Sequence, residues 1–503
     1  MHTPSKRPRW PLHRRGWRSA SMACLALGSL LGLAASSASA QGAPDPLMAW
    51  APAQTEVAVV FRGADGPADL VEYIKGRFGH VPRVAQAADR LMAWSPAPDI
   101  VPLARKWGPG LDPGKGAAAF ISFGPKIRIV MGVTDPDIAR QTATRYLKQL
   151  GAPAEVTANG VRVDRGLEFT CDHADGIIAC DTEGKPAKGP TPEWLKAAPI
   201  PTDGAALLYA SGKPLRRMSD GAPLQSIWAG VHRKADRVSF TFEAIPEPFI
   251  VKALENFTGP EGNSPVMALI DQSTPFVARV GFDSPTALER VEKLTGSPPP
   301  PVSDLWGALK AHWTGELVLA ADASLLQPVA LMGLRGGPEA GDALMKAIIK
   351  VMIAENPEFS IKTADHPRGV KGLRALVLTF DGMDDDRTEV VLPWATVPVK
   401  EGHALVLGVS PADIQRRLDG GLKPLSIDAA FASRGTYGFL FPGLPGSWGG
   451  FMLYEMLNTT SSAGLLLDGQ LMLGVMSELI DEIGLEIRPG PKTIRAEMWW
   501  RFL

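Results

Sequence analysis

MGVTDP, residues 131–136, and MGLRGGP, residues 332–338, decide the fold, because each ends an apolar strand pattern and begins a helix. The proline of each stretch stands in the first turn of the expected helix, where its fixed φ angle and missing N–H are tolerated. Residues at helical spacing then mark the buried face of each helix: Ile138, Thr142, Tyr146 and Leu150 in the first, and Ala340, Leu344, Ile348 and Met352 in the second. The chain therefore contains the same junction twice.

Further stretches repeat in the same order on either side of this junction. The matched stretches are Asp65-Gly66-Pro67 after VAVVF with Asp283-Ser284-Pro285 after PFVARVGF, GAAAFIS from Gly116 with GELVLAA from Gly315, GVRV from Gly160 with GLRA from Gly372, DGIIAC from Asp175 with EGHALVL from Glu401, and GAALLYA from Gly204 with GTYGFLF from Gly435. The shared order indicates an internal duplication. Coincidence in an Ala-, Gly- and Pro-rich chain is the alternative explanation.

Both halves end on an alternating hairpin pattern. The residues that share one face are Val238, Phe240 and Phe242 in the first half, and Ile494, Ala496, Met498, Trp500 and Phe502 in the second. Strands come in pairs followed by a helix, so we expect an α+β fold of two similar halves, 41–247 and 248–503. Each half is expected to be a mostly antiparallel or mixed sheet with helices packed on one face. The sequence leaves open whether the halves join into one sheet.

Residues 1–40 have the pattern of a cleavable secretory signal. Six basic residues and no acidic ones precede an apolar run, and the segment ends on Ala38-Ser39-Ala40. The apolar run is shorter than the ~20 residues of a membrane span. We therefore expect cleavage before Gln41, export to the periplasm or the extracellular space, and no transmembrane helix afterwards.

Charge and composition exclude some classes of partner. Removal of six basic residues from 52 leaves 46 against 53 acidic residues, so the processed chain carries about seven net negative charges. No basic footprint for nucleic acid remains. Peripheral membrane contact stays open.

Cys171 and Cys180 are the cysteines that remain after signal cleavage, and they flank the turn dipeptide Asp175-Gly176. A two-residue turn there pairs the two cysteines directly across a hairpin. The spacing suits a disulfide, and an exported protein meets an oxidising environment. Two free thiols, or a metal site with His173 and Asp172, are the alternative.

No catalytic signature is present. The stretch around Gly114-Lys115 lacks the glycine spacing and the hydroxyl of a P-loop, and the sequence contains no G-x-S-x-G, S-x-x-K or H-E-x-x-H motif. The six histidines outside the signal are scattered, which favours structural or surface roles: His80, His173, His232, His312, His366 and His403. We predict no catalytic residue and no cofactor.

Two segments remain as candidates for binding. The loop DGMDDDR offers four carboxylates, Asp381, Asp384, Asp385 and Asp386, which makes it the best metal candidate in the chain, although a solvated hairpin turn is the favoured explanation. Residues 443–476 are rich in Met and aromatic residues and poor in charge. Such a segment can form a lipid- or ligand-binding surface or a core helix.

The recurrent order of strand, D/S-x-P or S-P, then amphipathic helix resembles exported bacterial proteins classed only as domains of unknown function. It is seen at Asp65, Thr134-Asp135-Pro136, Asp283 and Ser410-Pro411. The resemblance spans most of the processed chain and implies a non-enzymatic envelope protein. It transfers no functional residues.

These observations lead to one expectation and two alternatives. We expect an exported, non-enzymatic binding or structural protein whose partner is an envelope protein or an apolar ligand. A carrier for a hydrophobic ligand or lipid is the first alternative, favoured by an apolar cavity. A hydrolase with a dispersed site is the second, favoured by a cleft that brings a serine or a carboxylate pair against a histidine. The duplication places the likeliest binding surface at the seam between the halves.

Overall fold

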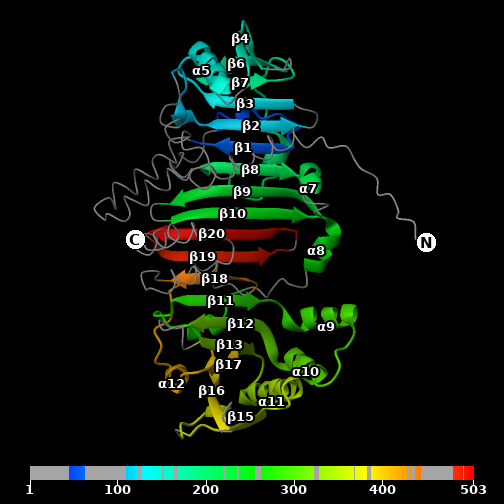
Figure 1. Cartoon of the computed structure of the whole chain (residues 1–503), viewed down its shortest axis with the longest axis vertical. Coiled ribbons are helices and arrows are strands. Elements are labelled where there is room, and N and C mark those ends of the chain that lie inside the picture. Colours follow the sequence, from blue (N-terminus) through cyan, green and yellow to red (C-terminus); the bar gives the residue numbers. More distant parts are fainter. Residues whose placement is uncertain are drawn as a thin grey trace, which may run out of the picture. The chain divides into compact units, whose positions relative to one another are not determined.

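The computed structural model describes most of the chain between residues 45 and 502 (Figure 1). The described residues are 45–62, 109–122, 126–149, 152–163, 167–202, 204–218, 223–234, 237–254, 262–321, 328–367, 369–381, 387–426, 431, 435, 437–442, 480–490 and 492–502. The expected signal, the Asp65 helix, His80, Asp384–Asp386 and residues 443–476 lie outside these ranges.

The first series of elements runs from residue 57 to residue 254. Its strands are β1 (Val57–Phe61), β2 (Ala117–Ser122), β3 (Lys126–Gly132), β4 (Ala154–Thr157), β5 (Gly160–Val163), β6 (Leu167–Ala174), β7 (Ile177–Asp181), β8 (Ala206–Ser211), β9 (Leu224–Lys234) and β10 (Arg237–Pro246). Its helices are α5 (Pro136–Gln149), α6 (Glu193–Lys196), α7 (Gly212–Met218) and α8 (Pro248–Leu254).

The second series runs from residue 276 to residue 502. Its strands are β11 (Phe276–Gly281), β12 (Trp313–Ala321), β13 (Pro328–Leu334), β14 (Ser360–Asp365), β15 (Leu373–Asp381), β16 (Arg387–Val399), β17 (Gly402–Gly408), β18 (Tyr437–Pro442), β19 (Ile480–Pro489) and β20 (Ile494–Phe502). Its helices are α9 (Ser284–Thr295), α10 (Val302–His312), α11 (Pro338–Glu355) and α12 (Pro411–Leu418).

The expected α+β fold is wrong, because the described structure is dominated by strands. Its twenty strands belong to one large antiparallel sheet, and its helices are few. Antiparallel hairpins leave unpaired edges, and strands distant in sequence pair along them. Examples are β3 with β7, β13 with β17 and β10 with β20. The local sequence pattern of strands and helices does not predict such long-range pairings, and the α+β expectation was wrong for this reason.

Two compact units divide the chain. The first contains residues up to Leu208 together with Gly230–Arg233, and the second contains Tyr209–Ala229 and Lys234–Leu503. In the first unit, Val133, Ala139, Phe169, Ile178 and Cys180 form a small core beside α5.

Two cores stabilise the second unit, one on each side of its strands. One lies where α10 and α11 pack on the sheet and includes Leu344, Trp394 and Leu405. The other side includes Val277, Val406, Ile414 and Trp499 and is covered in part by α12.

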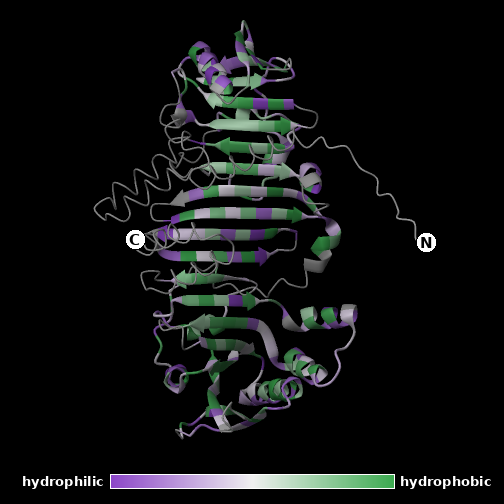
Figure 2. Ribbon diagram, in the orientation of Figure 1, coloured by the Kyte–Doolittle hydropathy of each residue, from purple (hydrophilic) through white to green (hydrophobic). Residues whose placement is uncertain are grey.

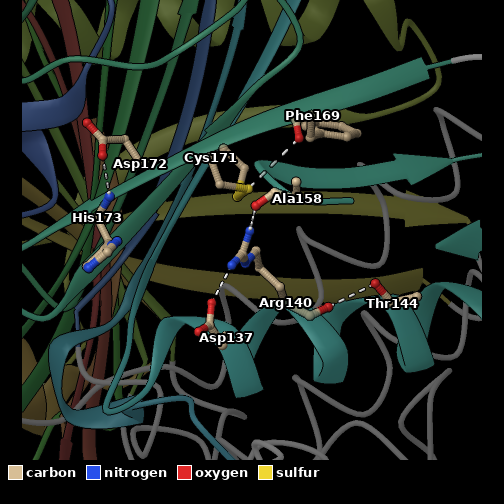
Figure 3. Close-up of a disulfide and its surroundings, with 9 residues drawn as sticks. Asp137, Arg140, Thr144, Ala158, Phe169, Cys171, Asp172 and His173 are labelled. Atoms are coloured by element: carbon tan, nitrogen blue, oxygen red, sulfur yellow. Dashed lines mark hydrogen bonds and ion pairs between the residues drawn. A yellow bond between two sulfur atoms is a disulfide. The ribbon is translucent and has the colours of Figure 1, made fainter. Parts of the chain in front are cut away.

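The β6–β7 hairpin follows the predicted register. Asp175 and Gly176 both have positive φ, as the two-residue turn requires, and Cys171 pairs with Cys180. The predicted disulfide joins the two cysteines (Figure 3). The amide of Cys171 donates to Asn159, on the side away from β7, which leaves the cysteine pair at a non-hydrogen-bonded position.

Candidate functional site

The second unit presents an apolar row that crosses six neighbouring strands, which Figure 2 colours by hydropathy. Cross-strand partners point to the same side of a sheet, so the registers of the neighbouring strand pairs place one residue from each strand in line. The row, from β12 through β11, β18, β19 and β20 to β10, is Leu319, Ala278, Phe439, Leu485, Met498 and Phe240. Each of these residues is apolar.

Two further rows flank it on the same side. One contains Tyr437, Ile487, Ala496 and Phe242, and the other contains Phe276, Phe441, Ile483, Trp500 and Val238. The tilted rings of Phe276 and Phe441 pack with centroids 5.0 Å apart, and the rings of Phe240 and Trp500 meet edge to face with centroids 5.2 Å apart. We call these three rows together the apolar face.

Parts of the apolar face are open to solvent. Phe242 and Leu319 are each 48% exposed, and Ile487 is 37% exposed. Single exposed apolar residues are ordinary, but aromatic and aliphatic residues that share one face form a patch of the kind that binds apolar partners. Burial also raises the pKa of the Tyr437 phenol on this face to about 12.

The opposite side of the same strands carries charge, and that charge is buried. Arg279 on β11, Glu486 on β19 and Glu497 on β20 belong to one row, with Gly438 between the first two. Arg279 is 2% exposed and Glu486 is 3% exposed. This side of the strands is therefore buried, with Arg279 and Glu486 beside core residues such as Trp499, whereas several large apolar residues of the other side are partly exposed.

Ion pairs compensate the buried charges. Nη2 of Arg279 lies 3.7 Å from Oε1 of Glu316, and its Nη1 donates to the carbonyl of Phe431. Burial lowers the pKa of Arg279 to about 10, although Glu316 and Glu486 oppose this shift. Along the seam between β10 and β20, Arg237 donates to Glu497 at 3.2 Å and covers the Trp499 ring at 4.7 Å. An ion pair on one side of the sheet and apolar contacts on the other side therefore join β10 to β20.

A polar pocket of about 320 Å³ lies at one end of β12, β13 and β17. Its polar side chains come from four segments: Asp283, Thr314, Glu316, Arg335, Glu401 and His403. Nη2 of Arg335 donates to the carbonyl of Trp313 at 2.6 Å, and Nδ1 of His403 lies 2.8 Å from the carbonyl of Gly336. Burial lowers the pKa of Arg335, and Asp283 opposes that shift.

The predicted site residues fall in different places. Asp381 ends β15 opposite Arg387, at the expected hairpin, while the other three aspartates lie outside the described ranges. Among the residues described, no group of three or more His, Cys, Asp or Glu could hold a metal ion. The metal candidate stays a prediction.

Sequence reasoning missed the polar pocket, since its residues are far apart along the chain. His403 was expected to have a structural or surface role, and it lines this pocket with Glu316 and Glu401. The pocket does bring carboxylates and a histidine together, as a hydrolase would require, but one nitrogen of the histidine already faces a backbone carbonyl. The available signal was the alignment of GAAAFIS with GELVLAA, which places Thr314 where the first half has Lys115.

Within the described part of the chain, no helix is long and apolar enough to cross a membrane. Neither a protein-family model nor a curated protein sequence matches the chain. Crystal forms III and IV of a protein called TP0453 align with 44% and 43% of this chain and with 90% and 86% of their own. Sequence identities are 10% and 11%, and the TM-scores are 0.23 and 0.24. Scores this low do not establish a shared fold.

Proposed function

We propose that the chain is an exported, non-enzymatic binding protein that takes a long acyl chain on its apolar face. The observation that carries the proposal is the partial exposure of large apolar residues on one side of strands whose other side is buried. On these strands Arg279 and Glu486 are buried, whereas Phe242 and Ile487 are partly exposed. Exposed apolar surface of this kind is retained where a partner covers it.

The dimensions of the apolar face support an acyl chain as the ligand. Strands lie about 4.8 Å apart, so a row across six strands extends about 24 Å. A lipid acyl chain spans about half of the ~30 Å hydrocarbon core of a bilayer, and therefore fits along the row. Each methylene group removed from water contributes about 0.8 kcal/mol. The middle row contains no charged residue that would oppose such a ligand.

Charge favours a single lipid over a membrane surface as the occupant. After cleavage before Gln41, the processed chain would hold 46 basic and 53 acidic residues. Anionic membranes attract basic surfaces and repel acidic ones. We therefore assign the apolar face to an individual acyl chain, and binding to vesicles becomes an arm of the test.

We also propose that residues 41–247 and 248–503 are repeats of one ancestral unit. In the first series, β1 pairs with β2 and β8, β2 with β3, and β3 with β7. In the second series, β11 pairs with β12 and β18, β12 with β13, and β13 with β17. Val59 lies in β1 and Val277 in β11, and α5 and α11 follow β3 and β13. The two orders of pairing agree, which supports the proposal.

A titration with a fluorescent long-chain fatty acid tests the proposed function. Phe242→Asp changes a residue that is already half exposed, so the variant is expected to fold and to bind the probe at least tenfold more weakly. Ile353→Asp is the matched control, because Ile353 is 41% exposed on α11. Equal affinity for both variants, or no binding by the wild type, would contradict the proposal. Sedimentation with phosphatidylcholine vesicles but no saturable probe binding would assign the face to a membrane instead.

A further inference from the structure

Lys115 fills a niche at the start of β2 in the first unit. Its Nζ lies 3.4 Å from the carbonyl oxygen of Asp175 and 3.8 Å from Oδ2 of Asp112. The ammonium group covers the β6–β7 turn closely, because a Cβ atom added to Gly176 would meet Nζ at 2.0 Å. One primary ammonium ion thus lies between a carboxylate and a turn carbonyl.

The second unit has a matching niche without the lysine. The residue after Lys115 is Gly116, with φ of 76°, and the residue after Thr314 is Gly315, with φ of 94°. In the first unit, a Cβ atom added to Gly132 would lie 2.5 Å from Cβ of Lys115. In the second unit, a Cβ atom added to Gly333 would lie 2.2 Å from Oγ1 of Thr314. The same close approach to a glycine occurs in both units, so Thr314 occupies in the second unit the position that Lys115 occupies in the first.

The turn beside the Lys115 niche also has a counterpart in the second unit. In the sequence match, Asp175-Gly176 aligns with Glu401-Gly402, and both glycines have positive φ. An added Cβ would approach the carbonyl of Val133 from Gly176 and the carbonyl of Leu334 from Gly402. Val133 directly follows β3, and Leu334 is the last residue of β13. The position of the Lys115 ammonium therefore maps onto the polar pocket.

The polar pocket has the volume and the charge to receive an ammonium group, which the side chain of Thr314 does not supply. It measures about 320 Å³, at the small end of ligand sites, and Asp283, Glu316 and Glu401 line it. Glu316 faces Arg279, while the guanidinium of Arg335 donates to a backbone carbonyl. With the charge of Glu316 compensated by Arg279, Asp283 and Glu401 against Arg335 still leave the lining acidic.

We propose that this pocket binds a small ligand through a primary ammonium group, which occupies the place that Lys115 Nζ fills in the first unit. The inference rests on the proposed duplication and is independent of the apolar face. An ammonium group is favoured over a metal ion, since the described residues contain no cluster of three metal-ligating side chains. Carboxylate oxygens and a turn carbonyl are suitable acceptors for its three N–H donors.

Isothermal titration of the full processed chain with n-butylammonium chloride tests this proposal, with n-butanol as the neutral control. Wild type is expected to bind one n-butylammonium ion and no n-butanol. Thr314→Lys supplies an internal ammonium group and is expected to abolish binding. Thr388→Lys, at an exposed position on β16, is the matched control and is expected to bind as wild type does.

A second variant keeps the test independent of how Thr314→Lys folds. Glu401→Gln removes one carboxylate at an exposed turn and is expected to weaken n-butylammonium binding about tenfold, the loss of one charge-assisted contact. Glu358→Gln, exposed before β14, is its control and should leave the affinity unchanged. Absence of n-butylammonium binding by wild type, or unchanged affinity in both Thr314→Lys and Glu401→Gln, would overturn the proposal. Neither result bears on fatty acid binding.

Discussion

Arg279 shows, at the scale of one residue, how the charged side of the sheet is balanced. Its side chain is fully buried, faces Glu316 and feels the field of Glu486 across the glycine at position 438. Buried ion pairs stabilise a fold little compared with apolar residues of the same volume, but loss of one partner leaves a charge without compensation. The arrangement therefore constrains substitutions strongly.

Arg279→Met is expected to lower the free energy of unfolding by about 3–5 kcal/mol, because the buried Glu316 loses its ion-pair partner. Arg279→Met combined with Glu316→Leu is expected to recover part of that loss. Urea unfolding followed by tryptophan fluorescence measures both. A single variant as stable as wild type would show that the pair contributes nothing.

Tyr437 gives the apolar face a dependence on pH. Burial raises the pKa of its phenol from 10.0 to about 12 in the folded chain. Between these values the folded state holds the proton more tightly than the unfolded state does, so the contribution to stability is complete below pH 10 and decreases as the pH rises toward 12. Absorbance titration of wild type against Tyr437→Phe should isolate this ionisation. A Tyr437 transition near pH 10 would contradict the burial.

At the scale of elements, the β6–β7 hairpin is the part of the fold that the sequence predicts best. Asp175-Gly176 dictates both the turn and the register, because few residues other than Gly and Asp tolerate the two positive φ angles. Pairings such as β3 with β7 and β10 with β20 could not be predicted, since they depend on which edges meet after the hairpins form. The excess of sheet over helix follows from those pairings.

The hairpin also supplies a test of processing. Thiol labelling of unreduced, unfolded protein is expected to detect no cysteine, because the disulfide consumes Cys171 and Cys180 and cleavage removes Cys24. The Cys171→Ala/Cys180→Ala variant should lose no more stability than the ~2–4 kcal/mol typical of disulfides, since the closed loop is short. One labelled cysteine per chain would indicate a retained signal, and more would contradict the bridge.

On the scale of the second unit, the proposed function depends on rows of residues that span six strands. The alternation of Phe240 and Phe242 with Thr241 and Glu243 could be recognised in the sequence, but its orientation could not. Alternation normally indicates a buried apolar side, and here the charged side is the more buried one. The polar pocket could be recognised only by comparing Lys115 in the first half with Thr314 in the second, because neither half reveals it alone.

Photo-crosslinking with a long-chain fatty acid that carries a terminal diazirine tests the central claim most directly. Mapping of the labelled peptides by mass spectrometry should place the crosslinks on β10, β18, β19 and β20, at residues of the apolar face such as Phe240, Leu485 and Met498. Excess unlabelled fatty acid should suppress them. Crosslinks confined to peptides outside these strands, or labelling that unlabelled fatty acid does not suppress, would contradict the assignment of the apolar face as the acyl-chain site.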